Sequence, residues 1–483
     1  MPIILGANSA TVASGGNASR WNLADSTRLY RTPGSASDTL KWTWAAWVKL
    51  APQPTNHTYW GQTLFCAFSD ASNYTEFAIQ NSGLMDYLNV TGGGTDGRLT
   101  TSRKSRDPSA WAHYLVVWDS ANASAGDRMK MYINGVEVTA FSADINPSSS
   151  LNSFMNSNVL TEIGSRDSGS QFFNGYMADV CFIDGLALTP TSFGEFDTDS
   201  PTMFKPINVS GLTFGTNGFY LDFKDSSDLG NDAAGSNNLT SAGFTAADQA
   251  TDEPTTNFCV VNPLDNYYAA STFSEGNCKI STHAANKTFN TSTMALSSGK
   301  WYWEIKYATV GSSSAEIGIA SVLTTQSGSG GGELNDSAGN YEYRSDGTKG
   351  NANSNTAWGN TWNTPGDIIG VALDLTNLKL YFSKNGVWQE SGDPTSGASG
   401  TGAAFTVTAP ASQTLLSSLY AYTPALGEEG AQTDVFEVNF GGCSAFDLTT
   451  SPAETDADGY GNFEFAPPSG YFAICTKNLA EYG

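Results

Sequence analysis

Charged residues are scarce in this sequence, and basic residues are scarcer than acidic ones. Charged side chains make up 14% of the 483 residues, against about a quarter in ordinary soluble domains. Only 23 lysines and arginines stand against 47 aspartates and glutamates, which gives a net charge of −24. A surface of that sign repels phosphate backbones and anionic lipids. We therefore expect no nucleic-acid partner, although an excess of carboxylates suits divalent cations.

Long apolar runs, paired cysteines and clustered histidines are also missing. No stretch approaches the roughly 20 apolar residues of a membrane-spanning helix, so we expect no membrane insertion. The first basic residue is Arg20, which is too late for the basic start of a signal peptide. The six cysteines contain no C-x-x-C pair, and the three histidines are far apart in the sequence. We expect synthesis in a reducing compartment, no zinc site and no signal peptide.

Glycine and aromatic residues, in contrast, are abundant: there are 50 glycines, and 12% of the residues are aromatic. This composition is typical of short strands joined by turns. Alternating or short apolar runs predict strands at 42–50, 63–68, 76–80, 114–119, 129–138, 301–307, 316–320, 367–375, 378–382 and 435–440. No segment sustains a helical period and no heptads occur. The sequence predicts an all-β protein built from antiparallel sandwiches.

The two halves of the chain resemble one another. In each half a strand enters an Asn-Gly turn, at Asn134-Gly135 and at Asn385-Gly386, where positive φ angles cost little. In each half an early strand also places two tryptophans on one face, at 42 and 44 and at 301 and 303. These parallels predict two related sandwiches in tandem.

We divide the chain into five segments on composition. The expected segments are an N-terminal arm (1–19), a first sandwich (20–205), a loop-rich acidic connector (206–270), a second sandwich (271–442) and an extended tail (443–483). Within the connector, residues 219–223 still read as a strand. The tail carries Phe463, Phe465, Tyr471 and Phe472, so we expect it to dock, either on its own domain or on a neighbouring subunit.

Motifs in the first half follow one another in a recognisable order. They are Trp44-Ala-Ala-Trp47, Trp111-Ala-His113-Tyr114, Tyr132-Ile-Asn134-Gly135, Phe173-Asn-Gly175 and Leu188-Thr-Pro190. With this order, residues 20–200 resemble the laminin-G-like, concanavalin-like jelly roll. The resemblance implies a β-sandwich of a ligand-binding type.

A second set of motifs occupies the other half. It consists of Trp301-Tyr-Trp303-Glu304, Ile317-Gly-Ile-Ala320, Gly366-Asp367, Leu380-Tyr-Phe382 and Asn385-Gly-Val387. Residues 271–441 with these motifs resemble a SPRY domain, which is also a concanavalin-like sandwich. The expected fold is therefore two tandem concanavalin-like antiparallel β-sandwiches with a loop-rich connector.

The whole arrangement is similar to a group of tailed-bacteriophage virion proteins. The features that carry this similarity are the two modules, the linker around Gly218–Asp232 and the ending Phe465-Ala-Pro467-Pro468-Ser-Gly470-Tyr471. The similarity implies a virion protein made in the host cytoplasm, with other virion proteins as partners.

Two sets of residues are candidates for binding. Laminin-G-like modules often bind calcium through aspartates, which makes Ca²⁺ the cofactor to expect and Asp70 and Asp107, on loops beside strands, its candidate ligands. In the SPRY-like half, aromatic rings flank a Gly/Asn/Ser-rich excursion and could stack on sugar rings. These rings belong to Tyr341, Tyr343, Trp358 and Trp362. The alternative, which we prefer, is that they pack in the core.

Catalytic motifs are weak. Glu195-Phe-Asp197-Thr-Asp199 is similar to the alternating carboxylates of concanavalin-like glucanases, but the second glutamate of that pattern is missing. His113 stands in a strand context that favours packing over base catalysis. No P-loop spacing occurs. The sequence predicts a protein that is not an enzyme.

The expected function is a virion structural protein, specifically a tail-fibre or spike-like component that binds a host-surface glycan or receptor. The alternatives are a purely structural head or tail decoration or connector protein and, more weakly, a glycan depolymerase. Without heptads, a homo-oligomer, with a trimer favoured for a fibre, would form through sandwich faces and terminal segments.

Overall fold

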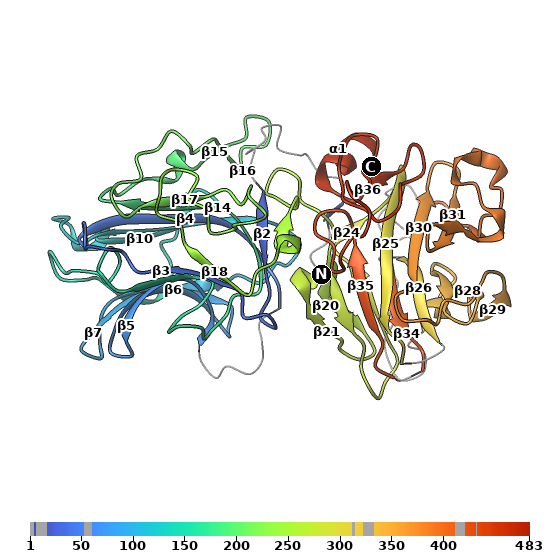
Figure 1. Cartoon of the computed structure of the whole chain (residues 1–483), viewed down its shortest axis with the longest axis horizontal. Coiled ribbons are helices and arrows are strands. Elements are labelled where there is room, and N and C mark those ends of the chain that lie inside the picture. Colours follow the sequence, from blue (N-terminus) through green and yellow to red (C-terminus); the bar gives the residue numbers. More distant parts are fainter. Residues whose placement is uncertain are drawn as a thin grey trace. The chain divides into compact units, whose positions relative to one another are not determined.

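The chain forms two compact units in the computed structural model shown in Figure 1. The N-terminal unit comprises Ala10–Thr255, and the C-terminal unit comprises Met1–Ser9 with Thr256–Gly483. The structure describes residues 4–5, 17–52, 60–311, 314–321, 333–410, 421–430 and 432–483. Within these ranges α1 (Thr476–Tyr482) is the one α-helix, and no helix is long and apolar enough to cross a membrane. The prediction of an all-β fold is confirmed.

Two sheets of the N-terminal unit face one another. The β4 sheet has the order β11 (Val136–Glu137), β10 (Met129–Ile133), β9 (Ala112–Asp119), β4 (Lys41–Leu50), β14 (Gly175–Asp184), β2 (Ala18–Trp21) and β19 (Gln249–Ala250), with β17 (Phe219–Leu221) beside β14. The β6 sheet has the order β12 (Phe141–Ile145), β8 (Gly94–Lys104), β7 (Leu84–Thr91), β6 (Asn73–Gln80), β5 (Trp60–Asp70), β13 (Leu160–Ile163), β3 (Arg28–Arg31) and β18 (Thr240–Ala242).

Alternating aromatic residues fill the space between these sheets. Trp42 and Trp44 are fully buried on β4, as their spacing predicted, and Trp44 stacks on Phe65 of β5 with ring centroids 5.8 Å apart. Because side chains alternate along a strand, the residues between these core positions point to the opposite faces of the sheets. The outer face of the β6 sheet is therefore free to carry polar groups.

The expected connector, 206–270, is divided between the two units. Up to Thr255 it completes the N-terminal sheets, since β17 pairs with β14, β18 with β3 and β19 with β2. The strand expected at 219–223 is present as β17. A short hairpin of β15 (Gly194–Phe196) and β16 (Phe204–Pro206) precedes it. From Thr256 onward the residues belong to the C-terminal unit. Most of the expected arm, 1–19, lies outside the described residues.

The C-terminal unit repeats the two-sheet plan. The β26 sheet has the order β20 (Val261–Tyr267), β23 (Thr288–Ser292), β34 (Tyr422–Glu428), β26 (Ala315–Ser321), β27 (Tyr341–Arg344), β28 (Thr348–Asn351) and β29 (Ser354–Ala357). The β25 sheet has the order β21 (Thr272–Ser274), β22 (Lys279–Ser281), β35 (Val435–Asn439), β25 (Lys300–Thr309), β30 (Ile368–Asp374), β31 (Lys379–Lys384) and β32 (Val387–Trp388), with β33 (Phe405–Thr406) on β31 and β36 (Phe472–Ala473) on β25. Trp301 and Trp303 are buried between these sheets, as predicted.

Short elements complete both units. β1 (Ile4–Leu5) pairs in parallel with β24 (Met294–Ala295). The 3₁₀ turns are η1 (Ala125–Asp127), η2 (Pro190–Ser192), η3 (Ala246–Asp248), η4 (Glu275–Asn277), η5 (Leu334–Asp336), η6 (Gln389–Ser391) and η7 (Pro394–Ser399).

The C-terminal tail docks on its own unit. Phe463 and Tyr471 are buried against Tyr302 and Tyr381 on the outer face of the β25 sheet. The Glu304 carboxylate holds the tail by accepting the backbone N–H groups of Glu464 and Phe465 at 3.0 and 2.8 Å. The structure thus shows that the apolar residues of the tail dock on their own domain, which was the first of the two alternatives.

The predicted Asn-Gly turns are confirmed in both units. Asn134 and Asn385 have φ angles of 49° and 50°, and the glycines that follow have 77° and 79°. Each glycine also leaves room for an aromatic ring. A Cβ added at Gly135 would lie 2.6 Å from the ring of Phe204, and a Cβ added at Gly386 would lie 2.7 Å from the ring of Phe465. In each unit, a segment that follows the sandwich places an aromatic residue on this turn.

Candidate functional site

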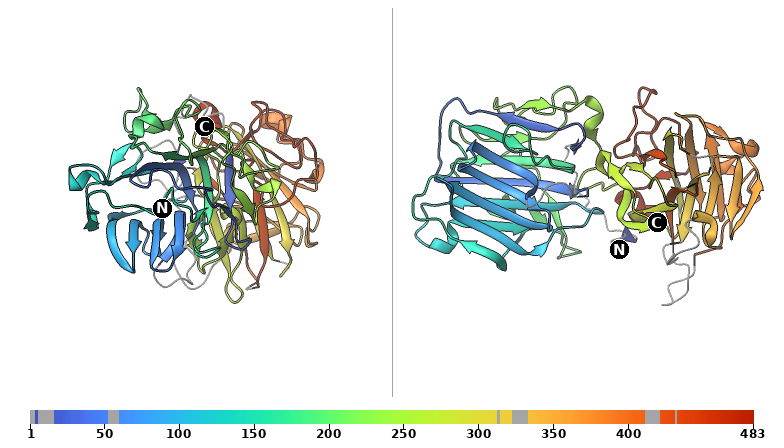
Figure 2. Two further views of the ribbon diagram at one scale, coloured as in Figure 1. Left: turned by 60° about the vertical axis from the view of Figure 1, so that its left-hand side comes forward. Right: turned by 90° about the horizontal axis from the view of Figure 1, so that it is seen from below.

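The outer face of the β6 sheet carries a row of side chains that sequence spacing alone does not bring together. Strand register aligns one residue from each neighbouring strand, and cross-strand partners share a face. The row consists of Arg98, Leu88, Glu76, Cys66, Glu162 and Tyr30. Five strand-to-strand steps of about 4.8 Å make it roughly 24 Å long. Figure 2, right, shows this sheet from that side, with β5 to β8 in blue.

Three arginines lie on this face, and each is held by a buried carboxylate. Arg166 contacts Glu76 at 3.0 Å, Arg28 contacts Glu162 at 2.9 Å, and Arg98 contacts Asp86 at 2.7 Å. The carboxylates are inaccessible to solvent, whereas the arginine side chains are 10 to 20% exposed. The three ion pairs balance in charge, so they add no net charge to this face of a strongly acidic protein.

Two of these arginines lie over aromatic rings. The Arg166 guanidinium is 4.0 Å from the ring centre of Tyr74 and 5.3 Å from that of Phe68. The Arg28 guanidinium is 4.6 Å from the ring centre of Tyr30. Tyr30 and Phe68 are partly exposed. The face therefore offers fixed planar donors next to apolar ring surfaces.

The buried carboxylates are fully engaged. Glu162 also accepts hydrogen bonds from the Ser165 hydroxyl at 2.8 Å and from the Ser168 N–H at 3.1 Å. Glu76 accepts one from the Thr63 hydroxyl at 2.6 Å. Burial raises the pKa of Glu76, against the opposing effect of Arg166. This arrangement orients the arginines and presents no free acid–base pair.

Cys66, between the two glutamates, is a poor nucleophile. Burial, with the negative charge of Glu76 as a second cause, raises the pKa of the Cys66 thiol well above its ordinary value. The thiolate is the reactive form of cysteine. The face is suited to binding by contact, not to covalent chemistry.

The aromatic residues expected to bind a ligand are in the C-terminal core, which corrects that interpretation and agrees with the preferred alternative. Tyr341, Tyr343 and Trp362 are at most 5% exposed, and Trp358 packs edge-on against Tyr343 with centroids 5.2 Å apart. Tyr341 and Tyr343 alternate on β27 and point to the sheet interface. Because other side chains cover the rings of Tyr341, Tyr343 and Trp362, a sugar cannot stack on these three, whereas Trp358 is partly exposed.

The calcium ligands expected at Asp70 and Asp107 do not converge, so the structure brings them to no common site. Asp70 closes the β5–β6 turn by accepting the Ser72 N–H at 2.8 Å, and Gly93 at the β7–β8 turn bonds to Ser72 at the same end of the sheet. Asp107 follows the far end of β8, after roughly 30 Å of strand. No cluster of three or more His, Cys, Asp or Glu side chains suited to a metal occurs in the part of the chain that the structure describes.

The weak catalytic motif lies on the β15–β16 hairpin, where Glu195 and Phe196 of β15 are exposed and β16 is buried. Glu195 and Asp197 both contact Lys205, at 3.4 and 3.2 Å. His113 is buried between the rings of Trp47 and Phe204, as its sequence context favoured.

Sequence reasoning missed the arginines of the outer face. One signal was available: eight of the nine arginines precede residue 170, in a chain where cations are rare. Their partners could not be found without strand register, since Arg166 and Glu76 are separated by 90 residues.

The comparisons with known families agree with this architecture. Residues 25–192 match the Concanavalin A-like lectin/glucanases superfamily, and residues 300–415 match the SPRY domain. The chain therefore contains a Concanavalin A-like (laminin G) domain followed by a SPRY domain, and both predicted resemblances are confirmed. No curated protein sequence matches the chain.

Among solved structures, the chain is similar to single domains. The SPRY domain of human HERC1 is 14% identical, with 37% of this chain and 96% of that one covered and a TM-score of 0.28. A SAP-like pentraxin from Limulus polyphemus is 16% identical, covering 37% and 80%, with a TM-score of 0.27. Domain 4 of the extracellular arabinanase AbnA from Geobacillus stearothermophilus, in complex with arabinotriose, is 18% identical, covering 32% and 65%, with a TM-score of 0.24.

Proposed function

We propose that this chain binds a neutral surface glycan without turning it over, through the outer face of the β6 sheet in its Concanavalin A-like domain. The observation that carries the proposal is the row of ion-paired arginines beside partly exposed rings. Guanidinium N–H groups donate to sugar hydroxyls, and the apolar faces of sugar rings stack on tyrosine or phenylalanine. The balanced charge of this face favours a neutral ligand over a polyanion.

The proposal extends to the particle of which the chain would be a component. We place the chain in the virion of a tailed bacteriophage, as a tail-fibre or spike-like component made in the host cytoplasm. The support for this is the resemblance in module order, linker and ending. Because single glycan sites bind weakly, several copies in a homo-oligomer, for which a trimer is favoured, would make adhesion effective.

A matched pair of tyrosine variants tests the binding face. Tyr30 lies on the outer face of the β6 sheet and Tyr132 lies on β10 of the β4 sheet, and both are partly exposed. Purified wild type, Tyr30→Ala and Tyr132→Ala are applied to a glycan array and to host cells. We expect Tyr30→Ala to lose tenfold or more in affinity, because a stacking surface is removed, and Tyr132→Ala to retain wild-type binding.

The same assay separates the alternatives. Failure of the wild type to bind any glycan or cell, with the protein detected in purified particles by immunogold electron microscopy, would establish a purely structural virion role. Release of reducing sugar from the bound glycan would establish a depolymerase. Equal loss of binding in both tyrosine variants would exclude this face as the site.

A further inference from the structure

The outer face of the β6 sheet repeats one small arrangement of side chains. On β3, the Arg28 guanidinium lies 4.6 Å from the ring centre of Tyr30. On β5, the ring centre of Phe68 lies 5.3 Å from the Arg166 guanidinium. Both rings are partly exposed, and both guanidinium groups are held by buried carboxylates. Each ring with its guanidinium forms a platform, so this face offers the same contacts twice.

Strand register determines the distance between the two platforms. Tyr30 pairs with Glu162 on β13. Glu162 pairs in turn with Cys66 on β5, and Phe68 follows Cys66 by two residues, on the same face of the sheet. The two rings are thus two strand steps of about 4.8 Å apart across the sheet and two residues of about 3.4 Å apart along it. Their Cα atoms are consequently roughly 12 Å apart.

The strand between the platforms, β13, forms the floor on which a ligand spanning both would lie. Leu160 pairs with Phe68, so Leu160 and Glu162 belong to this face. Leu160 is partly exposed, whereas the Glu162 carboxylate is inaccessible to solvent and is paired with Arg28 at 2.9 Å. A sugar unit between the platforms would therefore meet an apolar side chain and not a free carboxylate.

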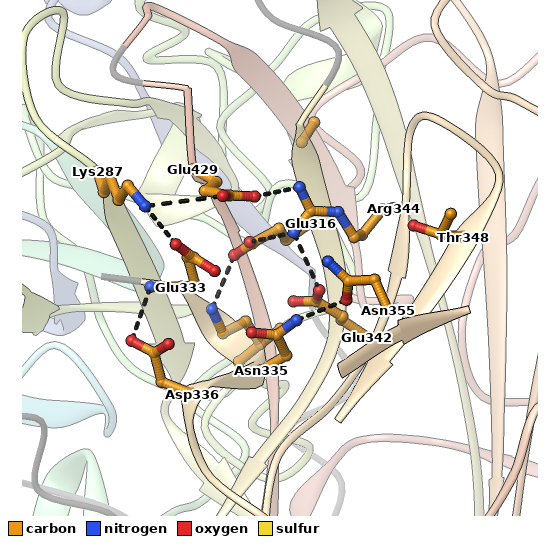
Figure 3. A network of polar contacts seen from close by, with 12 residues as sticks. Lys287, Glu316, Glu333, Asn335, Asp336, Glu342, Arg344, Thr348, Asn355 and Glu429 are labelled. Atoms are coloured by element: carbon orange, nitrogen blue, oxygen red, sulfur yellow. Dashed lines mark hydrogen bonds and ion pairs between the residues drawn. The ribbon is translucent and has the colours of Figure 1, made fainter. Parts of the chain in front are cut away.

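On the outer face of the β26 sheet in the SPRY domain, the ion-paired arginine is enclosed instead. Figure 3 shows Arg344 beside three carboxylates, those of Glu316, Glu342 and Glu429. The Arg344 side chain is only 5% exposed. The turn η5 contacts β26 and β27 there, and its residue Leu334 is buried and donates its N–H to Glu316 at 2.8 Å. An arginine shielded in this way offers no donor to a sugar hydroxyl.

The spacing of the platforms in the N-terminal unit has a chemical meaning. A ring and a guanidinium together bind one sugar unit, by stacking and by hydrogen bonds to its hydroxyls. The separation of the platforms is close to the repeat of two units in an extended pyranose chain. In chains with the β-linkage of cellulose, successive units are turned over, so every second unit presents the same ring face.

We propose that the ligand of this face is a linear, neutral oligosaccharide with cellulose-type β-linkages, at least three sugar units long. Its first and third units stack on Tyr30 and Phe68, and its second unit lies over β13. The inference rests on the proposed function and deepens it by naming the class of glycan. Contact with both platforms raises affinity, because the second contact is intramolecular once the first is made. A disaccharide occupies only one platform at a time.

The dependence of affinity on chain length tests the proposal. The full chain is titrated by calorimetry with cello-, manno- and xylo-oligosaccharides of two to six units, all with cellulose-type linkages. Malto-oligosaccharides of the same lengths, in which successive units are not turned over, provide the contrast. We expect affinity for at least one of the first three series to rise tenfold or more from two units to three, and we expect no such step in the malto series.

Variants at the two platforms locate this step. Tyr30→Ala and Phe68→Leu each remove one ring, and Phe68→Leu keeps an apolar side chain against the cluster that Phe68 contacts. In either variant we expect equal affinities for two and three units, because only one platform remains. Tyr132→Ala, on the β4 sheet, should keep the wild-type step.

The outcomes separate this inference from the proposed function. Equal wild-type affinity for two and six units in every series would overturn the inference alone, as would a step that persists in both Tyr30→Ala and Phe68→Leu. Binding to other glycans on the array, without binding to any cellulose-type series, would also overturn the inference alone. Absence of binding both in calorimetry and on the array would overturn the proposed function and the inference with it.

Discussion

His113 is a buried imidazole surrounded by rings. It lies between Trp47, Phe193 and Phe204, and its Nδ1 atom has no hydrogen-bond partner. Burial lowers the pKa of His113 to about 3, because a charged imidazolium would lose its solvation there. This residue is a structural aromatic side chain whose ionisation opposes folding.

Replacing His113 with phenylalanine should therefore make the N-terminal unit less sensitive to acid. Below pH 6.5 the unfolded chain takes up a proton that the folded chain refuses, so wild-type stability falls as pH falls from 6.5 toward 3. Between pH 7 and pH 4 we expect the free energy of unfolding to fall by about 3 kcal/mol more in wild type than in His113→Phe. Urea unfolding at both pH values measures it, with His283→Phe as the control. A wild-type pH dependence in His113→Phe would contradict the prediction.

At the residue scale, prediction from sequence succeeded where the alternation of residues along a strand determines which side chains face the core. The tryptophan pairs on β4 and β25 are buried as their alternation required. The same alternation correctly favoured burial of Tyr341 and Tyr343 over ligand contact. The outer-face arginines were missed because an ion pair such as Arg28 with Glu162 depends on long-range strand register, which residue spacing does not contain.

The tail is the element whose attachment depends most on one side chain. Glu304 accepts four hydrogen bonds, from the Tyr302 hydroxyl, the Asn439 amide and the N–H groups of Glu464 and Phe465. Each carboxylate oxygen takes two of them. Burial, opposed by these bonds, still raises the pKa of Glu304 to about 7.

Glu304→Gln should loosen the tail and reduce the pH dependence of the C-terminal unit. The amide NH₂ would face two donors, so the N–H groups of Glu464 and Phe465 should exchange faster with deuterium. In wild type the folded state retains a proton between pH 4.5 and 7 that the unfolded state has lost, so stability falls as pH rises through this window. We expect the free energy of unfolding of the wild type to fall by roughly 3 kcal/mol from pH 5 to pH 8, and we expect no such fall in Glu304→Gln.

Glu437→Gln is the matched control, since Glu437 lies on the same sheet and pairs with Lys279 and Lys306. Unchanged exchange at 464 and 465 in Glu304→Gln would show that Glu304 does not hold the tail.

The docked tail also changes what supports oligomerisation. Phe463 and Tyr471 are buried within their own unit, so their apolar side chains are no longer evidence for contact with a neighbouring subunit. The trimer stays a prediction that rests on the resemblance to fibre proteins. A deletion of residues 461–483 would expose Tyr302 and Phe258 and would report on folding of the C-terminal unit, not on assembly.

At the scale of the whole molecule, two tandem sandwiches were predictable from the repeated motifs, but the division of the chain was not. The segment 206–270 looks like a connector because its strands are short and its composition is acidic. Its strands β17, β18 and β19 nevertheless complete sheets whose other members lie far away in sequence. Edge pairings of two or three residues carry too little pattern to be found from sequence.

Residues 10–255 should consequently fold when expressed alone. The buried residues of their main core cluster run from Trp21 to Leu239, Phe244 packs against them, and the described strands of both sheets lie within residues 10–255. We expect a single cooperative unfolding transition by circular dichroism and calorimetry, with a β-rich spectrum. A shortened piece ending at residue 205, the limit expected from sequence, should be markedly less stable because β17, β18 and β19 are lost. Equal stability of the two pieces would contradict the division described here.

The pairing of β1 with β24 has a consequence for biosynthesis. Ile4 lies beside Met294, so β1 waits during synthesis for a partner about 290 residues later in the chain. At translation rates of about 5–20 residues per second, that delay is on the order of tens of seconds. The Concanavalin A-like domain can leave the ribosome and fold in the interval, while β1 remains unpaired. Closure of the C-terminal unit is therefore a late event, and β1 is open to chaperones until it occurs.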